Sequence, residues 1–401
     1  MFVVTHGTGM SLIDDFRKET RDWLDKNCPQ GARGPGQVPN GSTKIGISDP
    51  DVRLWLDRMV EKGWTVPNWP KEYGGAGLSN AQFVVLLEEM ARIHARPALS
   101  SFGTSMIAPT LLEMGSDEQK NRHLPRIARA EVEWCQGYSE PGSGSDLASL
   151  QTRAIDQGDH FVINGQKIWT SGAHNADWMF CLVRTDPSAK KQEGISFVLL
   201  PMDQDGITIS PIRMISGESP FNQVFFDNAI AKKEDLVSEL NQGWTVGKRL
   251  LQHERSGLES LASGGGAAED HDITRLAKEY LGDEDGLIAD PVWRNRVLCY
   301  QMNSEVFRLA QRRAVQESTD GATPGPVTSI FKVYGSELSQ EYDALAVELR
   351  GYRGVGNDAT FSETELAVTR HWLYNRASSI YSGSNEVQRN IIAKRVLGLP
   401  D

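Results

Sequence analysis

Hydrophobic periodicity changes twice along this chain of 401 residues. From residue 12 to about 124, apolar side chains recur every three to four positions, which is typical of amphipathic helices. Between residues 136 and 235 the period falls to two and β-branched and aromatic residues predominate, which indicates strands. Helical spacing returns at Asn241 and continues almost to the C-terminus. This order predicts a mainly α protein with a central β domain, unlike the alternating strands and helices of a dinucleotide-binding fold.

Three domains follow from these changes of period. We expect an N-terminal helical domain at 1–135, an antiparallel β domain at 136–238 and a C-terminal helical bundle at 239–401. Local signals refine this interpretation. Ser116 and Gln119 have the spacing of a capping box, which predicts that a helix begins there. Asn164-Gly165, between two apolar runs, predicts a two-residue hairpin turn.

Composition excludes several classes of function. The chain carries 42 basic and 53 acidic residues, a net charge of −11, with no block of like charges. This argues against a nucleic-acid surface and a polybasic membrane anchor. The four cysteines lie far apart and form no CxxC motif, which is typical of a reducing compartment and not of a zinc site. With no signal-peptide pattern and no membrane-length apolar run, we expect a cytoplasmic protein.

Two segments carry the most specific signal. Residues 138–152 read YSEPGSGSDLASLQT, and residues 379–393 read SIYSGSNEVQRNIIA. With INGQKIWTSGAHNAD at 163–177 and GWTVGKRLLQHER at 243–255, they resemble the acyl-CoA dehydrogenase family over roughly residues 12–398. The resemblance implies an acyl-CoA dehydrogenase-like fold that ends in a four-helix bundle, and it implies FAD as the cofactor.

The resemblance also implies which residues contact the cofactor. The segment around Ser139 would lie along the pyrimidine edge of the flavin, and Ser171 would be the partner of flavin N5. Hydrogen-bond donors and an aromatic wall suit a ring that gains negative charge on reduction. The expected cofactor-binding residues are Gln136, Tyr138, Ser139, Ser145, Trp169, Thr170, Ser171, Ser384 and Glu386.

The catalytic base is displaced relative to most of the family. Most members have a glutamate in the C-terminal segment where this chain has Ser382. A serine hydroxyl cannot act as a carboxylate base at neutral pH, although its backbone N–H can still hold the thioester oxygen. A minority branch supplies the base from another helix, just before an arginine. The matching pair here is Glu254 and Arg255.

Helix spacing is compatible with that role, because Val246, Leu250 and Glu254 stand four apart and share a face. Glu363 and Glu365 are distant alternatives as the base, and Glu254 could instead be a solvated helix residue. For the substrate, the resemblance implies contacts from Ser145, Arg255, Tyr381 and Gly383.

The resemblance further implies a reaction and partners. Glu254 would remove the α-proton of an acyl-CoA while hydride leaves the β-carbon, giving a trans-2-enoyl-CoA and passing electrons to an electron-transfer flavoprotein. The chain is most similar to the actinobacterial steroid side-chain type. Residues 288–303 lack the RxxFG pattern of homotetrameric members, so homo- or hetero-oligomers remain open, including an α2β2 assembly. Two alternative functions remain: a non-catalytic or half-site subunit, and a flavin oxidase or monooxygenase.

Overall fold

The computed structural model describes residues 8–255, 272–317, 325–356, 358 and 360–400, without the side chains of 8–11, 253–255 and 315–317. The chain divides into two compact units. The first comprises residues 1–212 and 220–254, and the second comprises 213–219 and 255–401. The predicted fold class is confirmed: helices precede a central β domain and helices follow it.

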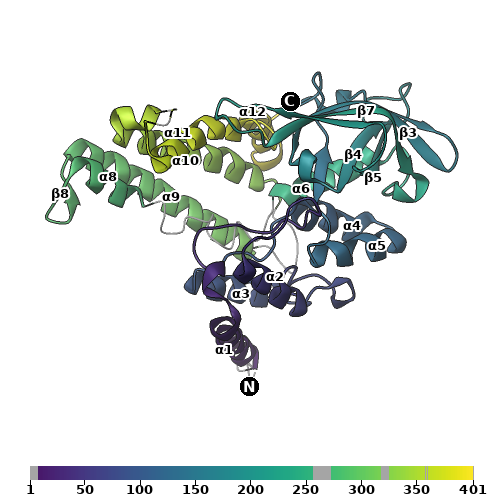
Figure 1. Cartoon of the computed structure of the whole chain (residues 1–401). Coiled ribbons are helices and arrows are strands. Elements are labelled where there is room, and N and C mark those ends of the chain that lie inside the picture. The colour runs from purple at the N-terminus through teal and green to yellow at the C-terminus, as the bar shows by residue number, and fades with distance from the viewer. Residues whose placement is uncertain (1–7, 256–271, 318–324, 357, 359, 401) are drawn as a thin grey trace. The chain divides into compact units, whose positions relative to one another are not determined.

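The first unit begins with a cluster of helices. They are α1 (Thr8–Asn27), α2 (Pro50–Glu61), α3 (Asn80–Arg92), α4 (Ala108–Met114) and α5 (Asp117–Ala128). The predicted capping box is present at the start of α5, where the Ser116 hydroxyl accepts a hydrogen bond from the Gln119 backbone N–H. Figure 1 shows α4 and α5 beside the β domain, and both contribute to a core shared with its strands.

The β domain is a seven-stranded sheet in the order β1-β4-β2-β3-β7-β6, with β5 on the other edge of β4. Its strands are antiparallel except that β1 and β2 run parallel to β4. The strands are β1 (Trp134–Gly137), β2 (Arg153–Asp156), β3 (His160–Ser171), β4 (Trp178–Arg184), β5 (Ile195–Pro201), β6 (Ile207–Ile212) and β7 (Phe221–Lys232).

The hairpin predicted at Asn164-Gly165 is wrong. Both residues lie inside the continuous strand β3, where the register against β7 shifts between Ile163 and Gly165. Asn164 exchanges two hydrogen bonds with Asn228, and Gly165 has φ +147°, a value that favours glycine. A Cβ on Gly165 would lie 2.7 Å from Thr152 Oγ1. The dipeptide therefore forms a bulge and a close strand contact, two other reasons for glycine in a strand.

Helix α6 (Gly243–Arg255) closes the first unit. Val246 and Leu250 have no exposed surface and belong to the core that joins α4 and α5 to the sheet. Two glycines permit this close packing. A Cβ on Gly243 would lie 2.2 Å from the Ser196 carbonyl carbon, and one on Gly247 would lie 3.2 Å from Leu182. The sheet thus positions α6 through backbone contact.

The second unit is helical. It contains α8 (Ile273–Leu281), α9 (Pro291–Glu317), α10 (Thr328–Leu349), α11 (Glu363–Asn375) and α12 (Asn385–Ile391). In Figure 1, α9, α10 and α11 lie side by side. A small hairpin, β8 (Asp283–Glu284) and β9 (Leu287–Ile288), separates α8 from α9. Its tip residues, Asp285 and Gly286, both have positive φ, as a type I′ turn requires.

Within the described ranges, no helix combines the length and the apolar character that a membrane crossing needs.

Candidate active site

The first part of the site is the strand β1 and the residues that follow it. Gln136 pairs with Phe180 on β4, and its side-chain Nε2 is buried with no hydrogen-bond partner among the described residues. A buried amide donor normally has an acceptor. Ser139 is half-buried, and its carbonyl accepts a hydrogen bond from the Ile168 N–H at 2.9 Å. The unsatisfied donor fits the flavin that the resemblance implies, because an isoalloxazine ring presents acceptors along one edge.

The second part is the end of β3. Trp169 has φ +61° and lies where the register against β7 shifts, and 53% of its surface is exposed. Its ring meets Phe221 edge-on at 6.1 Å between centroids. Ser171 is half-buried, whereas Thr170 points into the core with its Oγ1 buried. The bulge thus presents an indole outward next to Ser171, and only Thr170 among the three residues lies inside the domain.

A buried ion pair that sequence reasoning missed joins these two parts. Lys167 has no exposed surface, and its Nζ lies 2.8 Å from Glu140 Oε1 and 3.1 Å from the Tyr138 carbonyl oxygen. Glu140 also accepts the backbone N–H groups of Gln151 and Thr152, at 2.6 and 2.9 Å. Strand alternation carried the signal, because Lys167 stands at an alternate position of β3 after the buried residues Phe161 and Ile163.

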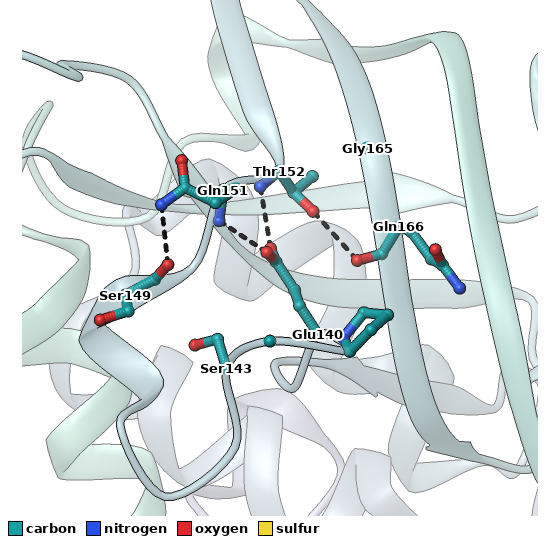
Figure 2. A pocket seen from close by; sticks show the side chains of 9 residues that line it. Glu140, Ser143, Ser149, Gln151, Thr152, Gly165 and Gln166 are labelled. Atoms are coloured by element: carbon teal, nitrogen blue, oxygen red, sulfur yellow. Dashed lines mark hydrogen bonds between the residues drawn. The ribbon is translucent and has the colours of Figure 1, made fainter.

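Figure 2 shows Glu140 among the residues that line a pocket of about 510 Å³. Its wall is formed by the loop after β1, the segment before β2 and the middle of β3; the lining residues are Glu140, Pro141, Gly142, Ser143, Ser149, Gln151, Thr152, Gly165 and Gln166. Ser145, expected near the cofactor and the substrate, is exposed in the turn that follows Ser143. The Ser143 hydroxyl stabilises that turn by donating to the carbonyls of Asp146 and Leu147.

Tyr138 connects this region to α6. The tyrosine is buried, and its ring meets Phe180 and Phe197 edge-on. A Cβ on Gly247 would lie 3.4 Å from the Tyr138 hydroxyl oxygen. Position 254 continues the row of Val246 and Leu250 by helical periodicity. The side chains of Glu254 and Arg255 lie outside the described residues.

The remaining residues expected at the site lie in the second unit, which is a separate compact unit of the chain. Ser382 and Gly383 have φ values of +55° and +85°, so two successive residues are left-handed. Gln388 Nε2 lies 3.3 Å from the Ser382 carbonyl oxygen and 3.4 Å from that of Gly383. The Ser384 hydroxyl caps α12 by accepting the Val387 N–H. Tyr381 is 44% exposed, and Glu386 is exposed in the first turn of α12.

The two glutamates considered as alternative bases, Glu363 and Glu365, make other interactions. Glu365 completes a capping box with Ser362 at the start of α11, and these hydrogen bonds lower the pKa of the Glu365 carboxyl. Glu363 is exposed and lies 3.7 Å from Arg370. A general base for neutral pH needs a raised pKa. The environment of Glu365 acts in the opposite direction.

The two arginines of residues 288–303, the stretch that lacks the RxxFG pattern, interact with other residues of the second unit. Arg294 donates twice to the Ile288 carbonyl oxygen, at 2.9 and 2.7 Å. Arg296 lies 2.7 Å from Glu348 and stacks over Trp293. Arg294 therefore holds the small hairpin, and Arg296 holds α10. Within the described part of the chain, no group of His, Cys, Asp or Glu could hold a metal ion.

The buried carboxyl group of Glu133, next to β1, should make the stability of the fold depend on pH. Burial raises the pKa of Glu133 to about 7, against hydrogen bonds from the Ser101 hydroxyl and the Phe102 N–H. A carboxyl with a raised folded-state pKa stabilises fully below its unfolded pKa, and this contribution is lost as pH rises through the folded pKa. The contribution therefore declines between about pH 4.5 and 7.

We expect Glu133→Gln to gain stability relative to the wild type as pH rises from 5 to 8, by as much as about 3 kcal/mol. Denaturant unfolding of both proteins at the two pH values measures this difference. Asp177, which also raises the pKa of Glu133, repels the ionised carboxylate in the wild type only, so its effect is part of the expected difference. An equal difference between the proteins at both pH values would contradict the prediction.

Comparisons with known proteins agree with this architecture. Models of the acyl-CoA dehydrogenase N-terminal, middle and C-terminal domains match residues 14–131, 135–229 and 241–397. The chain is 38% identical to the acyl-CoA dehydrogenase IpdE1 of Mycobacterium tuberculosis over 399 residues, which cover 98% of this chain and 99% of that protein. It is 34% identical to the acyl-CoA dehydrogenase FadE26 of the same organism, covering 96% and 97%.

Two solved structures are similar over nearly the whole chain. The Tcur3481-Tcur3483 steroid ACAD matches with a TM-score of 0.76 and 28% identity, covering 97% of this chain and 98% of that one. The ChsE4-ChsE5 complex from Mycobacterium tuberculosis matches with a TM-score of 0.74 and 29% identity, covering 100% of both chains.

Proposed function

Because this chain belongs to the acyl-CoA dehydrogenase family, we propose that it catalyses the FAD-dependent α,β-dehydrogenation of an acyl-CoA to the trans-2-enoyl-CoA. Electrons then pass to an electron-transfer flavoprotein. The observation that carries the proposal is the arrangement at β1 and β3. There, a buried and unsatisfied Gln136 amide accompanies an outward-facing Trp169 and a half-buried Ser171.

The family implies a flavin, and we propose FAD held by the residues around β1, β3 and α12. Gln136 and Ser139 would hydrogen-bond the pyrimidine edge, Trp169 would cover the ring, and Ser171 would face N5. FAD, when bound, accepts a hydride from the β-carbon of the substrate. The Glu140–Lys167 ion pair contributes indirectly, because it secures both chain segments in one geometry.

Glu254 is the proposed general base, on a helix that Gly243, Val246, Gly247 and Leu250 pack tightly against the sheet. Its carboxylate would take the α-proton, and the Ser382 backbone N–H would hold the thioester oxygen while negative charge develops there. Arg255, Tyr381 and Gly383 would line the acyl-CoA site. Ser384 and Glu386 would contact the cofactor from the start of α12.

The substrate proposed is a CoA thioester of a steroid or other bulky acyl group. Its support is the likeness to a structure described as a steroid ACAD and to relatives that align over their full length. We also propose that the chain works in an oligomer, with a second, different chain as partner. The likeness to a chain of the ChsE4-ChsE5 complex supports the heteromeric form.

A half-site subunit is the second candidate. In that form the chain would bind partner and substrate but leave an FAD site incomplete. The engagement of Arg294 with the Ile288 carbonyl favours it, because that arginine has two donors committed to its own unit. The presence of Ser382 in place of the usual glutamate favours it as well.

The visible spectrum of the purified chain, followed by anaerobic addition of acyl-CoA, tests the function. We expect the absorption bands of oxidised flavin, with an intensity that corresponds to about one flavin per chain. These bands should bleach on addition of a steroid-acyl-CoA and recover on addition of an electron-transfer flavoprotein. A straight-chain acyl-CoA with the same number of carbon atoms is the control substrate for the steroid-acyl-CoA. Oxygen consumption during turnover would instead indicate an oxidase, and a colourless chain that takes up no FAD would favour the half-site subunit.

A further inference from the structure

A row of polar side chains on α10 lies beneath the left-handed turn. Lys332, Ser336 and Gln340 are four residues apart, so they share one face of the helix. Lys332 Nζ donates to the Ser378 carbonyl at 2.6 Å and lies 3.3 Å from Asn385 Oδ1. Ser336 donates to the same Asn385 oxygen at 3.1 Å. These contacts join α10 to both ends of residues 378–385.

Gln340 extends the row at the other side. Its Nε2 lies 3.1 Å from the Asn375 carbonyl oxygen, 3.1 Å from Ser378 Oγ and 3.2 Å from Ser379 Oγ. Asn385 is buried, and its own Nδ2 lies 3.4 Å from Glu337. The backbone that leads into the turn and the residue that starts α12 are therefore both held by one rigid helix.

The turn between these anchors is strained. Ser382 is left-handed without being glycine, which costs free energy, and such a conformation persists only when the surrounding structure holds it in place. Gly383 has φ +85°, where any other residue would be strained, and a Cβ there would also have to displace Gln388 Nε2, which would lie 2.4 Å away. Such a turn keeps its geometry only while both ends stay in place. Lys332 contacts both ends, at Ser378 and Asn385, and its cation lies 5.9 Å from the centre of the Tyr381 ring.

We propose that Lys332 is a positioning residue that holds residues 381–383 in the geometry that aims the Ser382 backbone N–H, an inference that rests on the proposed function. The ammonium group restricts the conformation of the turn through two hydrogen bonds to its ends and a contact with the Tyr381 ring. It also places a positive charge below a segment next to which the reaction accumulates negative charge. Lys332 itself need not touch the substrate.

Three variants test this role. Lys332→Met removes the charge and both hydrogen bonds but keeps the apolar stem, and Lys332→Arg restores a cation with donors. Lys278→Met, on α8, makes the same chemical change at a lysine whose ion pair is with Asp283. For each protein we would measure hydrogen exchange of peptides covering 376–386 and 363–375, then kcat and KM for acyl-CoA.

In Lys332→Met we expect faster exchange confined to 376–386, and a fall in kcat of roughly 10²-fold with little change in KM, because misplacing a reacting group by about 1 Å has that effect. Lys332→Arg should recover the slow exchange and most of kcat, and Lys278→Met should match the wild type in both.

The proposal is overturned if Lys332→Met exchanges like the wild type, if it loosens 363–375 equally, or if kcat is unchanged. If the wild type itself reduces no flavin with any acyl-CoA, the proposed function fails. The exchange pattern then decides by itself whether Lys332 holds the turn.

Discussion

Replacing Lys167 with methionine is expected to destabilise the first unit by about 3–5 kcal/mol. The lysine side chain is fully buried, and its Nζ lies 2.8 Å from Glu140. Methionine fills similar space, but it leaves the Glu140 carboxylate buried without its counter-charge. An uncompensated buried charge costs far more than the intact pair contributes.

The pKa of Glu140 shows the opposing effects. Burial raises it, and the charge and hydrogen bond of Lys167, with hydrogen bonds from Thr152 and Gln151, outweigh burial so that the pKa is lowered. A depressed pKa means that Glu140 stabilises the fold above its unfolded pKa and that this contribution is lost as pH falls through the folded value. Lys167→Met should therefore lose most stability near neutral pH and less in acid.

Denaturant unfolding at pH 7 measures the effect, with Glu140→Gln and the double variant as matched controls. We expect the double variant to be more stable than Lys167→Met, because a neutral amide can keep the two backbone donors without carrying charge. A Lys167→Met protein within 1 kcal/mol of the wild type would show that the pair contributes little. Flavin retention should fall in parallel, since Ser139 directly precedes Glu140.

Glu254→Gln is expected to lower the rate of substrate-dependent flavin reduction by about 10²–10⁴-fold while flavin content stays unchanged. Glutamine keeps the size and hydrogen-bonding capacity of the side chain but cannot accept the α-proton. The chain has no base at position 382, where a serine stands. Stopped-flow bleaching of the flavin bands after mixing with acyl-CoA measures this step without the electron acceptor.

Glu363→Gln provides the matched control, because Glu363 is an exposed helix glutamate. Glu365→Gln is a second control, since glutamine preserves the capping box with Ser362. Both should reduce flavin at the wild-type rate. If Glu254→Gln also does so, the assignment of the base to α6 is wrong. Loss of flavin from Glu254→Gln would instead indicate that the residue supports the cofactor site.

Periodicity predicted the fold class correctly. The helix–strand–helix order and the capping box at Ser116 are confirmed, because both depend on local spacing. The misread pair Asn164-Gly165 shows where local reasoning stops. A two-residue turn and a bulge both favour glycine, and only pairing with β7 decides between them.

The identity of the residues expected around the flavin came from the sequence, through motifs that each carry a particular donor or ring. Which of their side chains face outward did not, because β3 reverses its alternation at the Trp169 bulge and buries Thr170. The same holds for Lys332, whose partners Ser378 and Asn385 lie 46 and 53 residues away. Spacing along one element determines which residues share a face. Contacts between distant segments depend on how elements pack, so only the tertiary structure decided which partners Lys167 and Lys332 have.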